Sequence, residues 1–477
     1  MSAPEDSFRT HRRIGVSRAE PPSGLTPRGP PGAPPPDEKP PAAPARPRGF
    51  VRGITLLGTV AFVVGNMVGT SAYTLPASLA EAVGPLGVVA WGLTAAGYLF
   101  VALVYASLGG RYPRTGGPYV FAREAFGDFG GFQVVWSYWL SAVIGNAAIL
   151  TGVMAYVVGF SRALSSSVVA QFAVAQAVLW GLCAVNVRGV RASSRLQIVA
   201  VCLNIIPLLL LAVAALFAFD ASNLRPFAPH GWGSLASGAA LVVWAYSGVE
   251  SATVPAEEVR APERTIRLGT MLGYALGTLV FLASALAVAG ALPNAAVASS
   301  ARPIAMVAER TVGPWAGTVI GLSAIVAGLG TLNGWVLMAG RIPVSASADG
   351  LFFKGLARLH PRYGTPHVSL VVSTAINSTM LLLYFNRSLL AAFNFLVLIA
   401  VLTTLFPHLY TCAAELMLAR REPHRYSEAE RRRAHVVAPV AFAFVLYTVY
   451  GVGAEVVLWG VLAILAGMPL YVWLRTR

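Results

Sequence analysis

Twelve apolar segments, each long enough to cross a lipid bilayer, recur along the sequence and restrict what the chain can fold into. A helix needs about 20 mostly apolar residues to span the hydrocarbon. Only 12% of the 477 residues are charged, whereas a soluble domain carries about 25%. We therefore predict an all-α membrane protein of twelve transmembrane helices. The segments are 54–80, 86–109, 129–160, 167–187, 195–219, 233–256, 268–292, 314–340, 367–385, 389–418, 436–453 and 455–474.

The positive charges lie between these segments rather than on one face. If the N-terminus and the end of every even-numbered segment face the cytoplasm, all but five of the 35 Lys and Arg residues lie on that side. Cytoplasmic loops of membrane proteins carry such an excess. We therefore predict that both termini are cytoplasmic, and the net charge of +15 implies no nucleic-acid partner. The five residues outside are Arg162, Arg225, Arg302, Arg310 and Arg387.

The first 52 residues differ in composition from the rest. Residues 1–50 hold 13 of the 32 prolines and almost no large apolar side chains. Such a segment buries too little surface to offset its ordering entropy, and it has no apolar core of a signal peptide. We predict a disordered, proline-rich cytoplasmic tail over 1–52 and a transporter domain over 53–475.

The first apolar segment contains a run that is poor in helix formers. The run Val64–Pro76 carries two glycines, an asparagine, hydroxyl residues and a proline. In hydrocarbon every backbone polar group must be satisfied, so an unwound stretch there indicates that the backbone binds something. We predict a broken helix that binds a substrate in a transporter.

The sixth segment repeats this pattern. Gly69 and Gly248 each stand seven residues before the proline of a Thr-x-Pro-Ala sequence. The first segment starts from inside and the sixth from outside, so the two copies have opposite topology. Interrupted helices at corresponding positions of two halves mark the midplane site of many transporters. We predict inverted repeats at about 53–220 and 232–418, followed by two further helices at 436–475.

These breaks suit an amino acid, which presents a carboxylate and an ammonium. Helix amino ends and freed N–H groups suit the carboxylate, and freed carbonyls suit the ammonium. We expect Gly69, Thr70 and Ser71 to supply the donors and the backbone of Trp244–Ser247 to supply the acceptors. The pattern says nothing of the substrate's side chain.

Glu250 is the only carboxylate near the middle of a predicted membrane helix. Burial of its charge is costly, and an intramembrane ionisable residue is therefore a functional candidate. One interpretation is a proton carrier or pH sensor; the other is a neutral glutamic acid that is hydrogen-bonded to neighbouring helices.

Several aromatic and polar side chains lie at depth in the predicted helices. Aromatic faces close a site and attract a cation, and each of them also packs without a ligand. The amide of Asn146 needs a partner, which is either a ligand or another helix, and His408 is either structural or functional. The aromatic candidates are Tyr138, Trp244, Tyr246 and Trp335.

No enzyme motif occurs in the sequence. There is no phosphate-binding loop, no dinucleotide fingerprint, no HExxH and no Cys/His spacing typical of a metal site. We therefore predict no catalytic residue, no metal and no cofactor, and the missing nucleotide motifs disfavour a pump with its own ATPase.

With these motifs in place, the chain from about 52 to 475 resembles the amino acid–polyamine–organocation transporters, and within them the bacterial basic amino acid/polyamine antiporters. The resemblance is carried by several ordered motifs. They are Gly65-Asn66-Met67-Val68-Gly69-Thr70-Ser71 with Leu75-Pro76-Ala77, Gly116-Gly117-Pro118-Tyr119, Tyr138-Trp139-Leu140 with Ile144-Gly145-Asn146, Gly248-Val249-Glu250-Ser251, Gly334-Trp335, Ala348-Asp349-Gly350-Leu351-Phe352, and Leu409-Tyr410-Thr411-Cys412-Ala413-Ala414.

The resemblance implies a five-plus-five inverted fold in the bacterial inner membrane, often as a homodimer, surrounded by lipid. It implies sodium-independent exchange of an amino acid for its decarboxylated amine. It further implies gates formed by Trp244 outside, Trp335 in the middle, and Tyr138 with Glu250 inside, with Tyr119 nearer the cytoplasm. The residues that would line the substrate are Met67, Thr70, Ser141, Ala142, Asn146, Ser247 and Trp335.

The sequence departs from the family pattern at four positions of the site and its gates. Ser71 stands where relatives have a second glycine, and Ser247 replaces a larger aliphatic residue. Ala400 replaces a serine that helps to hold a guanidinium group, and His408 replaces an inner-gate tyrosine, which makes it a second candidate pH sensor. These departures weaken the expectation of an arginine-type substrate, while Asn146 and Trp335 still favour a cation.

Three functions therefore remain open at the level of the sequence. The first is exchange of a basic amino acid for its amine. The second is proton-coupled uptake of neutral or broad-range amino acids by the same fold, although segment 195–219 has no lysine of the kind that some proton-coupled relatives carry. The third is a membrane sensor of amino acids.

Overall fold

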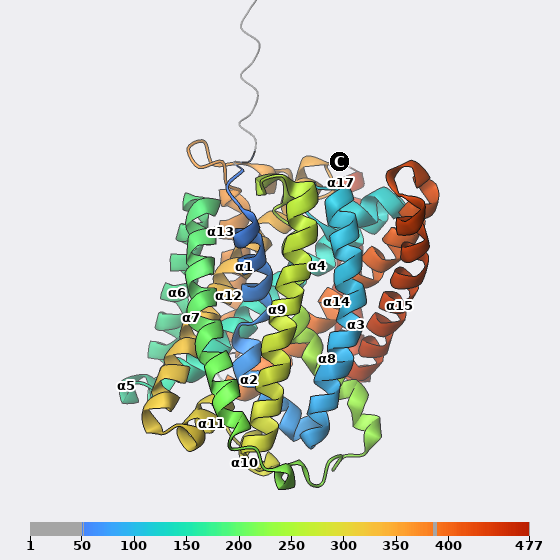
Figure 1. The fold of residues 1–477 in the computed structure, drawn as a ribbon. Coiled ribbons are helices and arrows are strands. Elements are labelled where there is room, and N and C mark those ends of the chain that lie inside the picture. The colour runs from blue at the N-terminus through green and yellow to red at the C-terminus, as the bar shows by residue number, and fades with distance from the viewer. Residues whose placement is uncertain (1–49, 51, 385–388, 477) are drawn as a thin grey trace, which may run out of the picture. The chain divides into compact units, whose positions relative to one another are not determined.

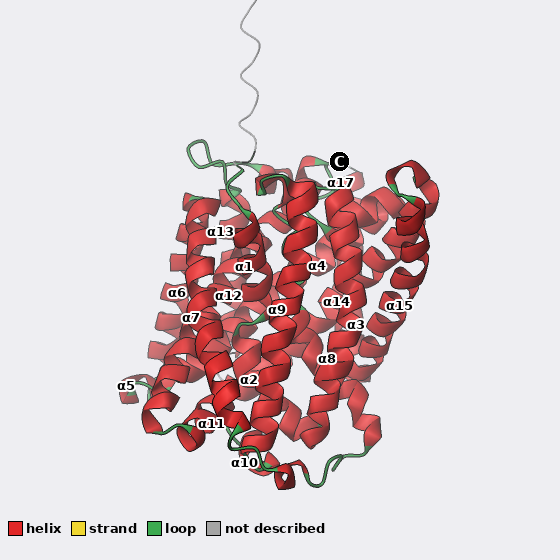
Figure 2. Ribbon diagram, in the orientation of Figure 1, coloured by secondary structure: helices red, strands yellow, loops and turns green. Residues whose placement is uncertain are grey.

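Every regular element of the described chain is helical (Figure 2). The computed structural model describes residues 50, 52–384 and 389–476. The predicted tail over 1–52 lies almost wholly outside these residues. The helices are α1 Leu56–Met67, α2 Thr70–Ala82, α3 Gly87–Arg111, α4 Pro118–Val158, α5 Arg162–Ser165, α6 Val168–Arg188, α7 Val190–Leu216, α8 Leu235–Tyr246, α9 Pro262–Ala291, α10 Asn294–Ala298, α11 Pro303–Thr311, α12 Pro314–Ala348, α13 His367–Tyr384, α14 Leu389–Arg421, α15 Glu428–Val452, α16 Ala454–Leu465 and α17 Gly467–Arg475 (Figure 1).

Ten helical spans within the described residues are long and apolar enough to cross a membrane, when α1 with α2 and α16 with α17 are each taken as one. The chain is thus a multi-pass, all-helical membrane protein. Two of the twelve predicted segments are not among these ten: α8 has 12 residues and stops at Tyr246, and the apolar stretch His367–Leu382 within α13 is shorter than the ten spans. The count of twelve spans and the inverted repeat stay predictions.

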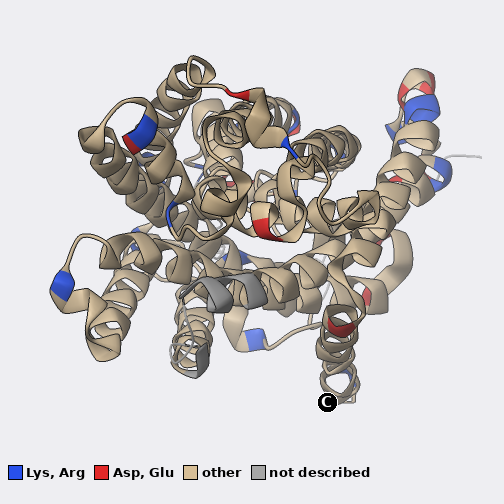
Figure 3. Cartoon of the chain, turned by 90° about the horizontal axis from the view of Figure 1, so that it is seen from below, with Lys and Arg blue, Asp and Glu red and all other residues tan. Residues whose placement is uncertain are grey.

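The boundaries of one predicted segment differ from the structure in an instructive way. The apolar run predicted a helix over 129–160, but α4 begins at Pro118. Its first turns carry Arg123 and Glu124, which a search for apolar runs excludes. Gly127 has non-helical φ/ψ of 78° and −170°, so α4 consists of two helical stretches joined at a kink. The second stretch starts just after this kink, close to the predicted boundary at 129, and the polar stretch before it was not predicted. Figure 3 shows that most of each helix is free of charged residues.

Helix α1 packs against α7, α9 and α12, while α4 packs against α12 and α14. Helix α1 lies close to α9 because Gly269, Gly273 and Gly277 share one face of α9. A Cβ added at Gly269 would lie 2.4 Å from a methyl carbon of Thr59, and one at Gly273 would lie 2.5 Å from the Cβ of Val63. Small residues at a spacing of four let membrane helices approach in this way.

The residues just before the amino end of α1 are tied to the segment that follows α8. The backbone N–H groups of Gly53 and Ile54 donate to the carbonyl of Glu258 at 2.9 and 3.0 Å, and Arg260 N–H donates to the carbonyl of Ile54 at 2.9 Å. The two interrupted segments are therefore joined at one end by backbone hydrogen bonds.

Candidate functional site

The first helix is interrupted after Met67. Val68 and Gly69 leave helical geometry, with φ/ψ of −88°/69° and −114°/−130°, and α2 begins at Thr70. No side chain caps the amino end of α2, so its first N–H groups face the break without that partner. A side chain at 69 would not fit, because an added Cβ would lie 1.9 Å from Thr331 Oγ1.

The second interruption lies beside the first. Helix α8 ends at Tyr246, and the chain then runs through turns to Pro255. Gly248 has a φ of 121°, and a Cβ added there would lie 2.9 Å from the carbonyl carbon of Asn66. Asn66 Nδ2 also donates to Ser251 Oγ at 2.7 Å. Two segments about 180 positions apart in the sequence thus meet at their breaks.

A small cavity of about 10 Å³ lies at this meeting point. A volume of this size holds about one water molecule, so a larger ligand requires the lining to move. Trp335 is buried and its indole N–H donates to the carbonyl of Asn66 at 3.4 Å. Trp244 packs over Gly145, where an added Cβ would lie 3.2 Å from the indole ring. The lining residues are Asn66, Met67, Thr70, Ser71, Ile149, Trp244, Thr331 and Trp335.

Five of the predicted site residues line this cavity together: Met67, Thr70, Ser71, Trp244 and Trp335. Three further lining residues, Asn66, Ile149 and Thr331, were not predicted from the sequence. Asn66 and Thr331 carry a usable signal, because each is a polar residue in a glycine-rich part of an apolar segment. Ile149 carries none, since nothing in an apolar helix marks which isoleucine faces a cavity.

The other predicted lining residues lie outside this small cavity. Ser141 on α4 donates from Oγ to the carbonyl of Ala400 on α14 at 3.0 Å. Ala142 and Ser247 are buried, and Ser247 Oγ donates to the carbonyl of Val243 at 3.2 Å. Asn146 is also buried, and its Oδ1 atom accepts no hydrogen bond in the described structure. Gly69 contributes only backbone.

Two of the predicted inner-gate residues are in direct contact. Tyr138 OH donates to Oε1 of Glu250 at 3.0 Å, and the backbone N–H of Gly248 donates to Oε2 at 3.0 Å. Glu250 is fully buried. The carboxyl group therefore joins α4 to the turn after α8, and both of its oxygens are used.

His408 lies in a different cluster. Its Nδ1 atom is 2.8 Å from Tyr105 OH, and its ring stands edge-on to those of Tyr98 and Tyr105 at centroid distances of 5.8 and 5.4 Å. Its Nε2 atom has no hydrogen-bond partner in the described structure. The histidine thus joins α14 to α3 within an aromatic group.

Tyr119 belongs to a polar group at the amino end of α4. Its hydroxyl donates to Asp349 Oδ2 at 2.8 Å, and Arg123 pairs with the same carboxylate at 2.6 Å. Arg123 also pairs with Asp128 at 2.9 Å. These contacts connect α4 to the end of α12. Among the described residues, no group of three or more His, Cys, Asp or Glu side chains is arranged to hold a metal ion.

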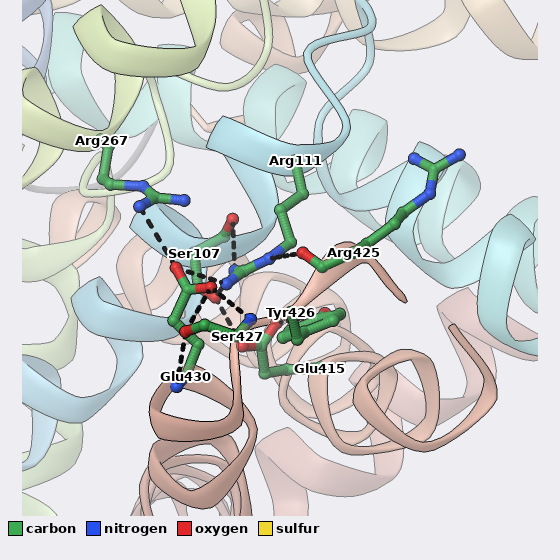
Figure 4. A network of polar contacts seen from close by, with 8 residues as sticks. All are labelled: Ser107, Arg111, Arg267, Glu415, Arg425, Tyr426, Ser427 and Glu430. Atoms are coloured by element: carbon green, nitrogen blue, oxygen red, sulfur yellow. Dashed lines mark hydrogen bonds and ion pairs between the residues drawn. The ribbon is translucent and has the colours of Figure 1, made fainter. Parts of the chain in front are cut away.

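A second polar network fastens the turn between α14 and α15 (Figure 4). At its centre, Arg111 of α3 pairs with Glu430 of α15 at 2.8 Å and lies over the ring of Tyr426 at 3.9 Å. Glu415 of α14 accepts hydrogen bonds from Ser107 at 2.5 Å and from Tyr426 at 3.2 Å. Since both carboxylates are occupied from within the network, its role is to hold four elements together.

The helices long enough to cross a membrane, and the small cavity beside the first helix break, define a multi-pass membrane protein with an internal polar site. The amino acid permease family matches residues 54–474, nearly the whole described chain. The protein therefore belongs to the amino acid permease family, within the amino acid–polyamine–organocation superfamily. This confirms the family that the sequence motifs indicated.

Curated relatives support the same placement. The chain is 28% identical over 421 residues to a putative arginine/ornithine antiporter of Bacillus subtilis, covering 82% of this chain and 89% of the relative. It is 32% identical over 369 residues to a cadaverine/lysine antiporter of Escherichia coli, covering 75% and 82%. It is 28% identical over 410 residues to the putrescine transporter PotE of Escherichia coli, covering 85% and 92%.

Proposed function

We propose that this protein is a secondary transporter that exchanges a basic amino acid for its decarboxylated amine by alternating access. One relative's name pairs lysine with cadaverine, its decarboxylated amine; another pairs the basic amino acids arginine and ornithine, and a third names the amine putrescine. The observation that carries the proposal is the cavity between the two helix breaks, which combines uncapped backbone, hydroxyl groups and two tryptophans.

The amino end of α2 suits the carboxylate of the substrate. A helix amino end carries partial positive charge and free N–H groups, and it favours an anion. Thr70 and Ser71 form its first turn and line the cavity. Ser71 Oγ donates to the carbonyl of Met67 at 2.8 Å, so its hydroxyl steadies the break rather than pointing freely at a ligand.

The tryptophans of the cavity suit a cationic side chain. Trp335 and Trp244 both line it, and a cation over an aromatic face is attracted by roughly 0.5–2 kcal/mol. Asn146 lies on the same helix as Ile149 and has a buried, unpartnered carbonyl oxygen, which is an acceptor for an ammonium group once the cavity opens.

Two sets of contacts are proposed to close the cytoplasmic side: Tyr138 with Glu250, and Tyr119 with Asp349. Both would have to separate when substrate leaves inward. The proposal includes both termini in the cytoplasm and a location in the bacterial inner membrane, as the charge distribution predicts. A homodimer is part of the same proposal.

Exchange is tested with the purified protein in liposomes. Vesicles loaded with agmatine, cadaverine or putrescine should take up labelled arginine, lysine or ornithine, and empty vesicles should not. A Trp335→Ala variant should lose most of this uptake. The matched control is Trp315→Ala, because Trp315 is 65% exposed on the outer surface of the helix bundle. Uptake of equal rate into empty and loaded vesicles would contradict exchange.

One observation favours a second function, proton-coupled uptake of neutral or broad-range amino acids. Glu250 is a buried carboxyl group in direct contact with the break, and position 400 carries only a methyl group. Under this alternative, empty vesicles accumulate leucine or alanine when a proton gradient is imposed. Amino acid binding with no flux under either condition would instead indicate a sensor.

A further inference from the structure

Three arginines gather in one pocket of about 190 Å³ on the flank formed by α6, α7 and α13. Arg188 ends α6, Arg191 lies in the first turn of α7, and Arg362 belongs to the loop that precedes α13. Gly189, with a φ of 132°, makes the bend that turns α6 into α7. Helix α6 packs against both α7 and α13, and the three helices lie toward the left of Figure 1.

None of these guanidinium groups forms an ion pair within the part of the chain that the structure describes. Arg362 lies 5.6 Å from the ring centroid of Tyr363, and all three side chains are exposed. One carboxylate, Glu258, also lines the pocket, but Arg341 neutralises it through two hydrogen bonds, one of them 3.0 Å long. The pocket thus presents three positive charges that lack a counter-ion.

An apolar groove of about 390 Å³ continues from this pocket and shares Arg188 and Tyr363 with it. Trp180 and Val371, which lie 40% and 43% exposed on α6 and α13, form part of its wall. From Trp180 to Arg188 the helix rises by about 12 Å, so the groove runs along the lipid-facing flank and ends at the arginines. The remaining lining residues are Cys183, Ala184 and Val187.

We propose that this pocket and groove bind one anionic phospholipid of the cytoplasmic leaflet, with the phosphate at Arg188, Arg191 and Arg362 and an acyl chain along Trp180 and Val371. Basic pockets between helices on the cytoplasmic side are suited to such head groups, and guanidinium groups match phosphate oxygens in geometry and charge. A soluble anion would fill the pocket and leave the groove unused. The placement rests on the predicted orientation, in which α6 ends at the cytoplasm, and not on the transported substrate.

The test uses the fluorescence of Trp180 in the full-length protein reconstituted in phosphatidylcholine vesicles. Either brominated phosphatidylglycerol or brominated phosphatidylcholine is added as a minor component, and the signal of a Trp180→Phe variant is subtracted. We expect phosphatidylglycerol to quench Trp180 more strongly, and the preference to fall as salt rises. Equal quenching by the two lipids at low salt would overturn the proposal without any arginine variant.

The arginine variants test the head-group pocket. The triple variant Arg188→Gln, Arg191→Gln, Arg362→Gln should lower the preference for phosphatidylglycerol by about tenfold or more, since three charge-assisted contacts are lost. The matched control is Arg264→Gln, Arg358→Gln, Arg431→Gln, which removes the same charge from exposed, unpaired residues outside the pocket. An equal loss in both variants would show a general surface effect and overturn the site.

Soluble glycerol phosphate distinguishes a lipid from a free anion. If it displaces brominated phosphatidylglycerol from the wild-type protein at equal concentration, the pocket is a soluble-anion site and the proposal is wrong. If the triple variant does not fold, Arg362→Gln in the exposed loop replaces it and should reduce the preference by a smaller factor in the same direction. An unchanged preference in that variant would also contradict the proposal.

Discussion

At the scale of the residue, Trp335 makes the clearest prediction about substrate recognition. It is 3% exposed, lines the cavity and contacts the first helix break through its indole N–H. We expect Trp335→Ala to raise the half-saturating concentration of a cationic substrate about thirtyfold, because a desolvated cation–π contact contributes about 2 kcal/mol. Trp335→Phe should keep most of the affinity, as it keeps an aromatic face. Equal effects of Ala and Phe on liposome uptake would show that the residue only packs.

Glu250 makes a prediction about pH dependence. If its carboxyl group takes up and releases a proton during transport, Glu250→Gln should flatten the dependence of transport rate on pH. Glutamine cannot accept both existing hydrogen bonds, because one end of its amide is a donor. Its oxygen can still accept from Gly248 N–H, and its NH2 group then faces the hydroxyl of Tyr138, which has to accept instead of donate.

Tyr138→Phe is the control for that change, because it removes the hydrogen bond from Tyr138 and keeps the carboxyl group. Its transport should be slower or less tightly gated, while its pH profile keeps the wild-type shape. A wild-type pH profile in Glu250→Gln would remove the proton-linked role of this residue and leave a structural one.

At the scale of the element, the glycine face of α9 controls how closely this helix approaches α1. We expect Gly273→Ala to destabilise the protein by about 1–3 kcal/mol, because the new methyl group would meet Val63 on a packed surface. The control is Gly92→Ala on α3, where an added Cβ meets nothing within 4 Å. That change should be neutral or stabilising by up to about 1 kcal/mol, since alanine favours the helix. Thermal unfolding in detergent compares the two, and equal midpoints would contradict the close-packing argument.

The positions of helices can be predicted from the sequence better than the contacts between helices. Long apolar runs must form helices in hydrocarbon, and this is why the location of most helices could be predicted. The glycine face of α9 was missed, since its meaning depends on which helix lies opposite. The same reason explains the site: Thr70 and Ser71 stand out within the first break, whereas Thr331 and Ile149 reach the cavity from distant helices.

At the scale of the whole molecule, the two interrupted segments are joined to each other at several points. Asn66 contacts the turn after α8, and the backbone of Gly53 and Ile54 contacts Glu258. Tyr138 of α4 and Trp335 of α12 also contact these segments, at Glu250 and at Asn66. Under the proposed alternating access, we expect the two interrupted segments to move together, and these contacts to change when they do.

The ion pair between Glu258 and Arg341 gives the last prediction at this scale. Both side chains are almost fully buried, and the pair fastens α12 to the segment that holds the start of α1. Arg341→Met should reduce the free energy of unfolding by about 3–5 kcal/mol, because it leaves a buried carboxylate without its partner. The double variant Arg341→Met, Glu258→Leu should be more stable than Arg341→Met, since it removes the stranded charge as well. Unfolding in denaturing detergent measures both variants. If the second substitution adds a further loss instead, the pair stabilises the fold by more than the cost of burying its charges, and the argument from an uncompensated carboxylate is wrong.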